Sequence, residues 1–166
     1  MAPPYRPRQF VWCQFPYMEE PLRPGPKEHV GYVADIRQIA GNPHLTVMSL
    51  DPTSVPWAPG MRLPPGVIPV EPALAAKMNQ KGFVMDARKI AFIPLSPAFF
   101  PRLAESGKGI VHTASERFHQ LVQNTLVLLA KPPELVVKLG PDGPGATGRT
   151  PKPPKRAGSS SSPRRR

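Results

Sequence analysis

Apolar residues in this chain occur in short runs separated by segments rich in proline and charge. Runs of four to seven residues that are rich in aromatic and β-branched side chains predict strands. These runs fall at residues 10–15, 30–36, 44–50, 67–70, 82–86, 89–93 and 134–139. In the first run, alternation places Phe10 and Trp12 on one face and Val11 and Cys13 on the other. Both faces are largely apolar, which predicts a strand buried on one side and partly covered on the other.

Three segments carry helical signals instead. The clearest is 113–129, where apolar residues recur every three or four positions and Thr113 and Glu116 have capping-box spacing. Shorter helices are predicted at 72–80 and 96–104. The order is strands, a small helix, further strands, and then one or two helices. This order predicts an α+β domain, mainly β: a compact, strongly bent antiparallel sheet or small barrel with helices at one end.

Two long segments between these elements are predicted to be irregular. Residues 16–29 contain four prolines and five charged side chains, and residues 52–66 contain five prolines. The whole chain has 26 prolines, so we expect few helices and stiff loops. Binding residues often lie on loops held by rigid strands, although a charged loop is more commonly only solvated.

Charge is distributed unevenly along the chain. The net charge is +11, and +6 of it falls in residues 140–166, which hold seven Lys or Arg, one Asp and no large apolar side chain. That composition predicts a disordered basic tail rich in Pro, Ser and Arg. Residues 1–9 are expected to form a flexible arm, and residues 10–139 a single domain. The basic balance favours polyanionic partners, nucleic acid first and an acidic protein second.

Compartment signals are few. The single cysteine, Cys13, excludes an intrachain disulfide and fits a reducing compartment. Residues 1–9 show no apolar signal-peptide core, and the longest apolar run, 126–130, is far shorter than the ~20 residues that a membrane span requires. We therefore expect a soluble cytoplasmic protein without membrane contact.

Motifs with a fixed mechanism are missing. The four histidines have no partner at metal-ligand spacing, and neither the G-x-S-x-G pattern nor a phosphate-loop pattern occurs. Neither a metal nor a cofactor is predicted.

The polar residues that remain suit phosphodiester chemistry, which needs an acid, a base and a donor for the charged phosphorane. Each of them also has a structural interpretation, as a surface histidine, a turn or a tryptophan packed on the sheet. The candidates are His29, Lys27 and Arg23 for the acid, base or cation, Thr53 and Ser54 for hydrogen bonds to phosphate, and Trp57 for stacking a base.

Four short stretches follow one another in a distinctive order. VWCQFP at 11–16 is followed by PGPK at 24–27, DPTS at 51–54 and MDARKIAFIP at 85–94. Their type and order resemble the MazF/PemK-like toxins of bacterial type II toxin–antitoxin systems. That family shows a VWCRFP-type opening strand, a PGPK-x-RP loop, a YGTS turn and an FDLxR strand. The resemblance spans residues 10–100 and rests on the order of the motifs.

This resemblance implies a small SH3-like antiparallel β-barrel with one or two C-terminal helices, usually a homodimer. It implies an endoribonuclease that cleaves single-stranded RNA without metal and is inhibited by an acidic antitoxin protein. Thr53 matches the family's site threonine, and Ser54 lies beside it. His29 stands at the position of the family's arginine. Arginine is always charged and binds phosphate bidentately, whereas histidine is only partly charged near pH 7.

The resulting hypothesis has His29, Thr53 and Ser54 as catalytic residues. Arg23, Lys27 and Trp57 would bind the substrate, with Lys27 or Arg23 supplying the missing positive charge. Two alternatives stay open. One is a catalytically inactive barrel module that binds nucleic acid or protein. The other is a structural subunit of a larger assembly, in which the basic tail fills gaps between negative charges.

Overall fold

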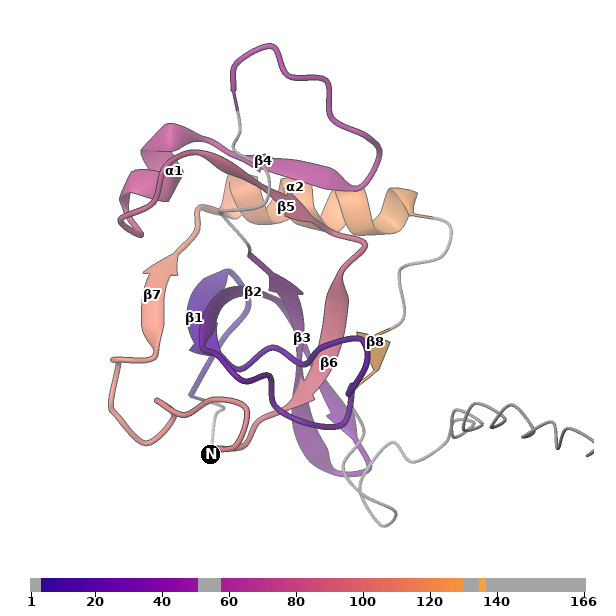
Figure 1. The fold of residues 1–166 in the computed structure, drawn as a ribbon, viewed down its shortest axis with the longest axis vertical. Coiled ribbons are helices and arrows are strands. Elements are labelled where there is room, and N and C mark those ends of the chain that lie inside the picture. Colours follow the sequence, from indigo (N-terminus) through magenta and orange to yellow (C-terminus); the bar gives the residue numbers. More distant parts are fainter. Residues whose placement is uncertain (1–3, 51–57, 130–134, 137–166) are drawn as a thin grey trace, which may run out of the picture.

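The protein is seen in a computed structural model that describes residues 4–50, 58–129 and 135–136. These residues form a six-stranded sheet, a two-stranded sheet and two helices (Figure 1). The large sheet has the strand order β7-β1-β2-β3-β6-β8, and β4 pairs with β5. Among the described residues every pairing is antiparallel except that of β6 with β8. This arrangement confirms the predicted class, an α+β fold with mainly antiparallel strands.

The elements in chain order have the following bounds. They are β1 Gln9–Cys13, β2 His29–Ile39, β3 Asn42–Ser49, β4 Val67–Val70, α1 Pro72–Ala76, β5 Phe83–Asp86, β6 Ile90–Pro94, β7 Ile110–Thr113, α2 Glu116–Leu128 and β8 Leu135–Val136.

The hairpin of β2 and β3 forms the centre of the large sheet. It turns at Ala40 and Gly41, whose φ angles are 49° and 80°. Two consecutive residues with positive φ make the tight turn whose twist matches that of the flanking strands. Both strands are longer than predicted because pairing continues to Ile39 and Asn42, next to the turn. A register shift between Val33 and Asp35 bends the hairpin, as β-bulges do.

Two apolar clusters occupy the two faces of the large sheet. The first cluster joins the sheet to β4, β5 and both helices, and its largest members include Phe10, Tyr32, Met48, Ile68 and Phe83. The second cluster lies on the other face and includes Val11, Cys13, Leu45, Phe99 and Phe100. The alternation predicted for β1 is confirmed for Phe10, which belongs to the first cluster, and for Val11 and Cys13, which belong to the second.

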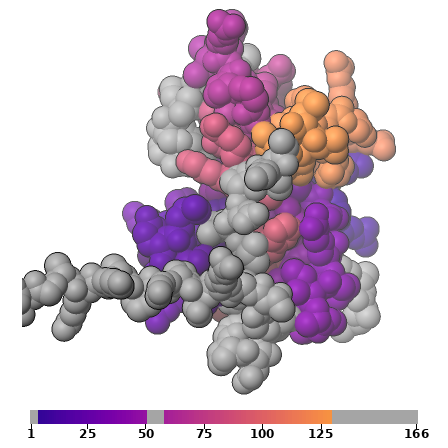
Figure 2. Space-filling model, turned by 90° about the vertical axis from the view of Figure 1, so that its right-hand side faces the viewer, coloured from indigo at the N-terminus to yellow at the C-terminus, as the bar shows by residue number. Residues whose placement is uncertain are grey.

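Helix α2 lies with β4 and β5 at one end of the large sheet (Figure 1 and Figure 2). Val122 is fully buried against the first cluster, while Leu121 is 44% exposed. The predicted capping box is wrong, because Thr113 still belongs to β7. The helix instead starts after Ser115, whose Oγ accepts a hydrogen bond from the Phe118 amide at 3.2 Å.

A hydrogen-bond network fixes α2 to β2. The Tyr32 hydroxyl lies 2.7 Å from His119 Nδ1, and Gln123 Nε2 lies 2.9 Å from the Ala34 carbonyl and 3.3 Å from His119 Nε2. Gln123 Nε2 has two hydrogens, one for the Ala34 carbonyl and one for His119 Nε2. Because His119 Nε2 then accepts, Nδ1 carries the imidazole proton and donates it to the Tyr32 oxygen. Desolvation, followed by the nearby charge of Arg8, lowers the pKa of His119. The network therefore holds a neutral imidazole.

The helix predicted at 96–104 is wrong. This segment forms turns, because Pro101 in its middle has no amide hydrogen and its ring would clash with the preceding helical turn. Phe99 and Phe100 are nevertheless buried in the second cluster. The short strand β7 follows this segment and pairs with β1. The sequence analysis did not predict β7.

Residues 4–9, which were expected to belong to a flexible arm, make defined contacts. Tyr5 is 3% exposed in the second cluster. The Arg8 amide donates to the Val33 carbonyl at 3.0 Å, and its guanidinium donates twice to the Ala114 carbonyl at 3.0 and 2.9 Å. The predicted tail at 140–166 lies outside the described residues.

Candidate functional site

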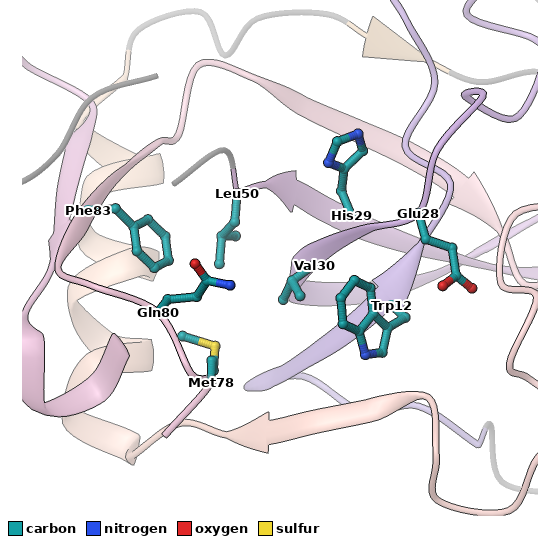
Figure 3. A pocket seen from close by; sticks show the side chains of 8 residues that line it. All are labelled: Trp12, Glu28, His29, Val30, Leu50, Met78, Gln80 and Phe83. Atoms are coloured by element: carbon teal, nitrogen blue, oxygen red, sulfur yellow. The ribbon is translucent and has the colours of Figure 1, made fainter. Parts of the chain in front are cut away.

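A pocket of about 130 Å³ opens between the start of β2 and the segment that joins α1 to β5 (Figure 3). Its walls are mainly apolar, and the polar groups on them come from a carboxylate, an imidazole, an amide and an indole. The described lining residues are Trp12, Glu28, His29, Val30, Leu50, Met78, Gln80 and Phe83.

Strands β1 and β2 and the end of β3 build one wall of the pocket. Trp12 pairs with Val30 across the two strands, and the Leu50 amide donates to the Val30 carbonyl at 3.2 Å. Trp12 shares a sheet face with Phe10 because alternate residues of a strand point the same way. The pocket thus continues the face that carries the first cluster, at the edge where that cluster ends.

The opposite wall comes from the turn after α1. Asn79 has a φ of 56°, and the Gln80 amide donates to the Ala75 carbonyl at 3.0 Å. This left-handed turn reverses the chain after one and a half turns of helix. It brings Met78 and Gln80 opposite the start of β2, and β5 then begins at Phe83.

The charged loop between β1 and β2 is folded back onto β1. The Gly25 amide donates to the Gln14 carbonyl at 3.2 Å. A Cβ atom at position 25 would collide with the carbonyl oxygen of Phe15, so only glycine fits this approach. The loop is therefore anchored in its middle and delivers Glu28 and His29 to the pocket.

An ion pair supports the pocket from behind Trp12. Arg102 Nη2 lies 2.8 Å from Glu28 Oε2, and Arg102 Nε lies 3.2 Å from the same oxygen. The guanidinium carbon of Arg102 is 4.6 Å from the centre of a Trp12 ring, within the range of a cation–π interaction. Arg102 thus neutralises the carboxylate on the pocket wall and packs against the indole.

The structure brings only part of the predicted site together. His29, the first residue of β2, is half-buried and lines the pocket. Arg23 and Lys27 are exposed on the loop and do not line it, and Arg23 Nη1 lies 3.8 Å from Glu20. The predicted cations are therefore not in the described wall of the pocket.

The remaining predicted residues, Thr53, Ser54 and Trp57, lie outside the described residues.

Four residues of the site were missed by the sequence analysis. Glu28 lies between Lys27 and His29, which were chosen, and Trp12 could have been found from its place on the same strand face as Phe10. Gln80 and Arg102 come from distant segments, and Arg102 is 74 residues from Glu28 in the chain. No local pattern marks either of them.

Comparison of the chain with protein-family models, with curated proteins and with solved structures gives no match. Among the described residues, no three His, Cys, Asp or Glu side chains are placed to hold a metal ion together. Neither α1 nor α2, the helices of the described part of the chain, is long and apolar enough to cross a membrane.

Proposed function

We propose that this protein is an endoribonuclease that cleaves single-stranded RNA without a metal ion. The observation that carries the proposal is that His29, a proton-transfer group, is among the residues that line a ring-sized pocket, with its imidazole turned away from Trp12 in Figure 3. In the sequence, Thr53 and Ser54 follow Leu50, a residue of the pocket wall, by three and four positions. The net charge of +11 favours a polyanionic substrate.

The proposed reaction is transesterification within the RNA. The neutral imidazole of His29 takes the proton of a ribose 2′-hydroxyl while the 2′ oxygen bonds to phosphorus. The bond from phosphorus to the 5′ oxygen then breaks, and that oxygen takes a proton from solvent. Thr53 and Ser54 hydrogen-bond the phosphate oxygens. The products are a 2′,3′-cyclic phosphate and a free 5′-hydroxyl.

A cleavage assay on single-stranded RNA in the presence of a chelator tests this proposal. Loss of a general base costs about 10²- to 10⁴-fold in rate, and we expect this loss for His29→Ala. The matched control is His112→Ala, because His112 is also half-buried but does not line the pocket. The proposal fails if the wild-type chain does not cleave, or if both variants lose the same activity.

The proposal also implies a fold, a cellular location and partners for this protein. It places the chain among the MazF/PemK-like toxins, with an SH3-like barrel, a homodimer in the cytoplasm and an acidic antitoxin as inhibitor. Sedimentation of the purified chain tests the homodimer. An acidic reading frame next to the gene, whose product blocks cleavage, would support the antitoxin.

A second candidate function is binding without catalysis, either as a nucleic-acid module or as a subunit of an assembly. One observation favours it. The described wall of the pocket contains the Glu28 carboxylate but no Lys or Arg, so a phosphorane there would lack a cation. RNA binding with unchanged RNA ends after long incubation would support this candidate.

A further inference from the structure

We propose that the pocket is a subsite for one unpaired nucleobase, which stacks on the Trp12 indole and meets the Gln80 amide at its edge. This inference rests on the proposed function in one respect: it takes RNA as the ligand. It goes further by naming the part of RNA that is recognised and the residues that recognise it.

The size of the pocket suits a single ring system. Its volume is about 130 Å³, comparable with an engineered apolar cavity of about 150 Å³ that binds benzene. Val30, Leu50, Met78 and Phe83 contribute aliphatic, thioether and aromatic surface. A flat base fits such walls better than a phosphate, which needs several donors.

Trp12 is held as a stacking surface. Figure 3 shows the Gln80 amide and the Glu28 carboxylate on opposite sides of Trp12. Arg102 pairs with that carboxylate and lies 4.6 Å from the indole ring. Trp12 also lines the pocket, so part of its indole surface can receive a base, and Arg102 and Glu28 act as positioning residues.

Gln80 supplies the polar contact. It is exposed on the turn after α1, and its amide extends toward Val30 and Trp12 in Figure 3. A glutamine amide offers one donor and one acceptor side by side, which matches N7 and N6 of adenine. The subsite is therefore expected to prefer adenine over cytosine.

Binding must be measured separately from cleavage. Short 2′-O-methyl oligonucleotides lack the attacking hydroxyl, so they bind without reacting. The chain has two tryptophans, Trp12 and Trp57, so the Trp12 signal is the difference between the full-length wild type and Trp12→Leu, which keeps Trp57. We expect an adenine oligonucleotide to quench Trp12 fluorescence and an abasic oligonucleotide of equal charge to leave it unchanged.

Three variants test the named residues by anisotropy of a labelled oligonucleotide. Stacking on an aromatic side chain is typically worth about 5- to 150-fold in affinity, and we expect a loss in this range for Trp12→Leu. Gln80→Ala should lose the preference for adenine, and Gln80→Glu should shift it to cytosine, whose N4 donates to carboxylates. Gln38→Ala, at the exposed far end of β2, is the control.

Arg102 and Glu28 are tested as a pair. Arg102→Ala leaves an unpaired carboxylate on the wall and should weaken binding. Adding Glu28→Gln removes that charge and should restore most of the affinity. A lack of rescue would contradict the assigned role of the ion pair, since a purely structural defect is not repaired by removing the carboxylate.

The outcomes separate this inference from the proposed reaction. Equal affinity for abasic and adenine oligonucleotides, or unchanged affinity in Trp12→Leu and in both Gln80 variants, overturns the subsite even if RNA is cleaved. Base-dependent binding that disappears in these variants supports the subsite even if no cleavage occurs. Circular dichroism tests whether Trp12→Leu is folded. If Trp12→Leu unfolds, the two variants of the exposed Gln80 test the subsite instead.

Discussion

Replacing Tyr32 with phenylalanine removes one oxygen atom from the network that fixes α2 to β2. Tyr32 is fully buried in the first cluster, and the phenylalanine ring keeps its packing against Phe10 and Phe118. The substitution leaves no cavity in the apolar core. What is lost is the 2.7 Å hydrogen bond to His119 Nδ1.

The cost follows from the partner that is left behind. A typical hydrogen bond contributes about 0.5–1.5 kcal/mol net, whereas a buried donor left without a partner costs about 1–3 kcal/mol. His119 is only half-buried, so water can reach the imidazole and the lower part of the second range applies. We expect Tyr32→Phe to lower the free energy of unfolding by about 1–2 kcal/mol. For a chain of this length each kcal/mol lowers Tm by about 2–4 °C.

Urea denaturation of the full-length chain, followed by circular dichroism near neutral pH, measures this cost. Tyr17→Phe is the matched control, because it removes the same atom from a residue that is 48% exposed. A double-mutant cycle of Tyr32→Phe with His119→Ala should give a coupling energy of about 1 kcal/mol. Equal effects of the two tyrosine substitutions, or a coupling energy near zero, would refute the network as described.

Three further predictions concern pH, capping and salt. Burial lowers the pKa of both His119 and His112 below the ordinary 6.5, so the unfolded chain binds protons more tightly. Stability should then be full above about pH 6.5 and fall as the pH drops below it, which thermal melts across pH will show. Ser115→Ala should cost about 1 kcal/mol in urea denaturation, while Thr113→Ala should cost little because Thr113 does not cap the helix. If RNA binds the chain and all six net charges of residues 140–166 meet phosphates, the plot of log affinity against log salt concentration has a tail contribution of about −4. Deleting the tail should flatten that plot, and an unchanged slope would exclude the tail as the contact.

The fold was predictable where local pattern and tertiary packing agree. The strand at 67–70 has the predicted bounds, and β1 alternates as predicted between the two clusters. The prediction failed at 96–104, where a serine followed by proline suggested a helix start but Pro101 and two buried phenylalanines favour turns. It also failed for β7, whose four residues carry too short a pattern to stand out. The strand exists because β1 offers a free edge for pairing.

The site was predictable only where its residues are neighbours in the chain. His29 was found because it ends a charged loop and starts a strand. Gln80 reaches the pocket through the turn after α1. Arg102 reaches Glu28 and Trp12 through the segment before β7. Both segments are distant from His29 in the sequence. A pattern within a short window cannot reveal such an encounter, and Arg102 is recognisable only from its contacts with Glu28 and Trp12.

A histidine at position 29, together with the pairing of Arg102 beside Trp12, limits what the pocket can recognise. A guanidinium at position 29 would hold phosphate directly, and its binding would depend strongly on salt. Here the guanidinium of Arg102 is paired with Glu28 and lies over the indole, so it strengthens a surface for a base instead.

In the proposed function, the affinity for RNA therefore has two parts. The pocket contributes a stacking part that salt affects little, and the basic tail contributes a phosphate part that salt weakens. The two parts lie on separate segments of the chain, so substitutions in the pocket and deletion of the tail should have additive effects on the free energy of binding.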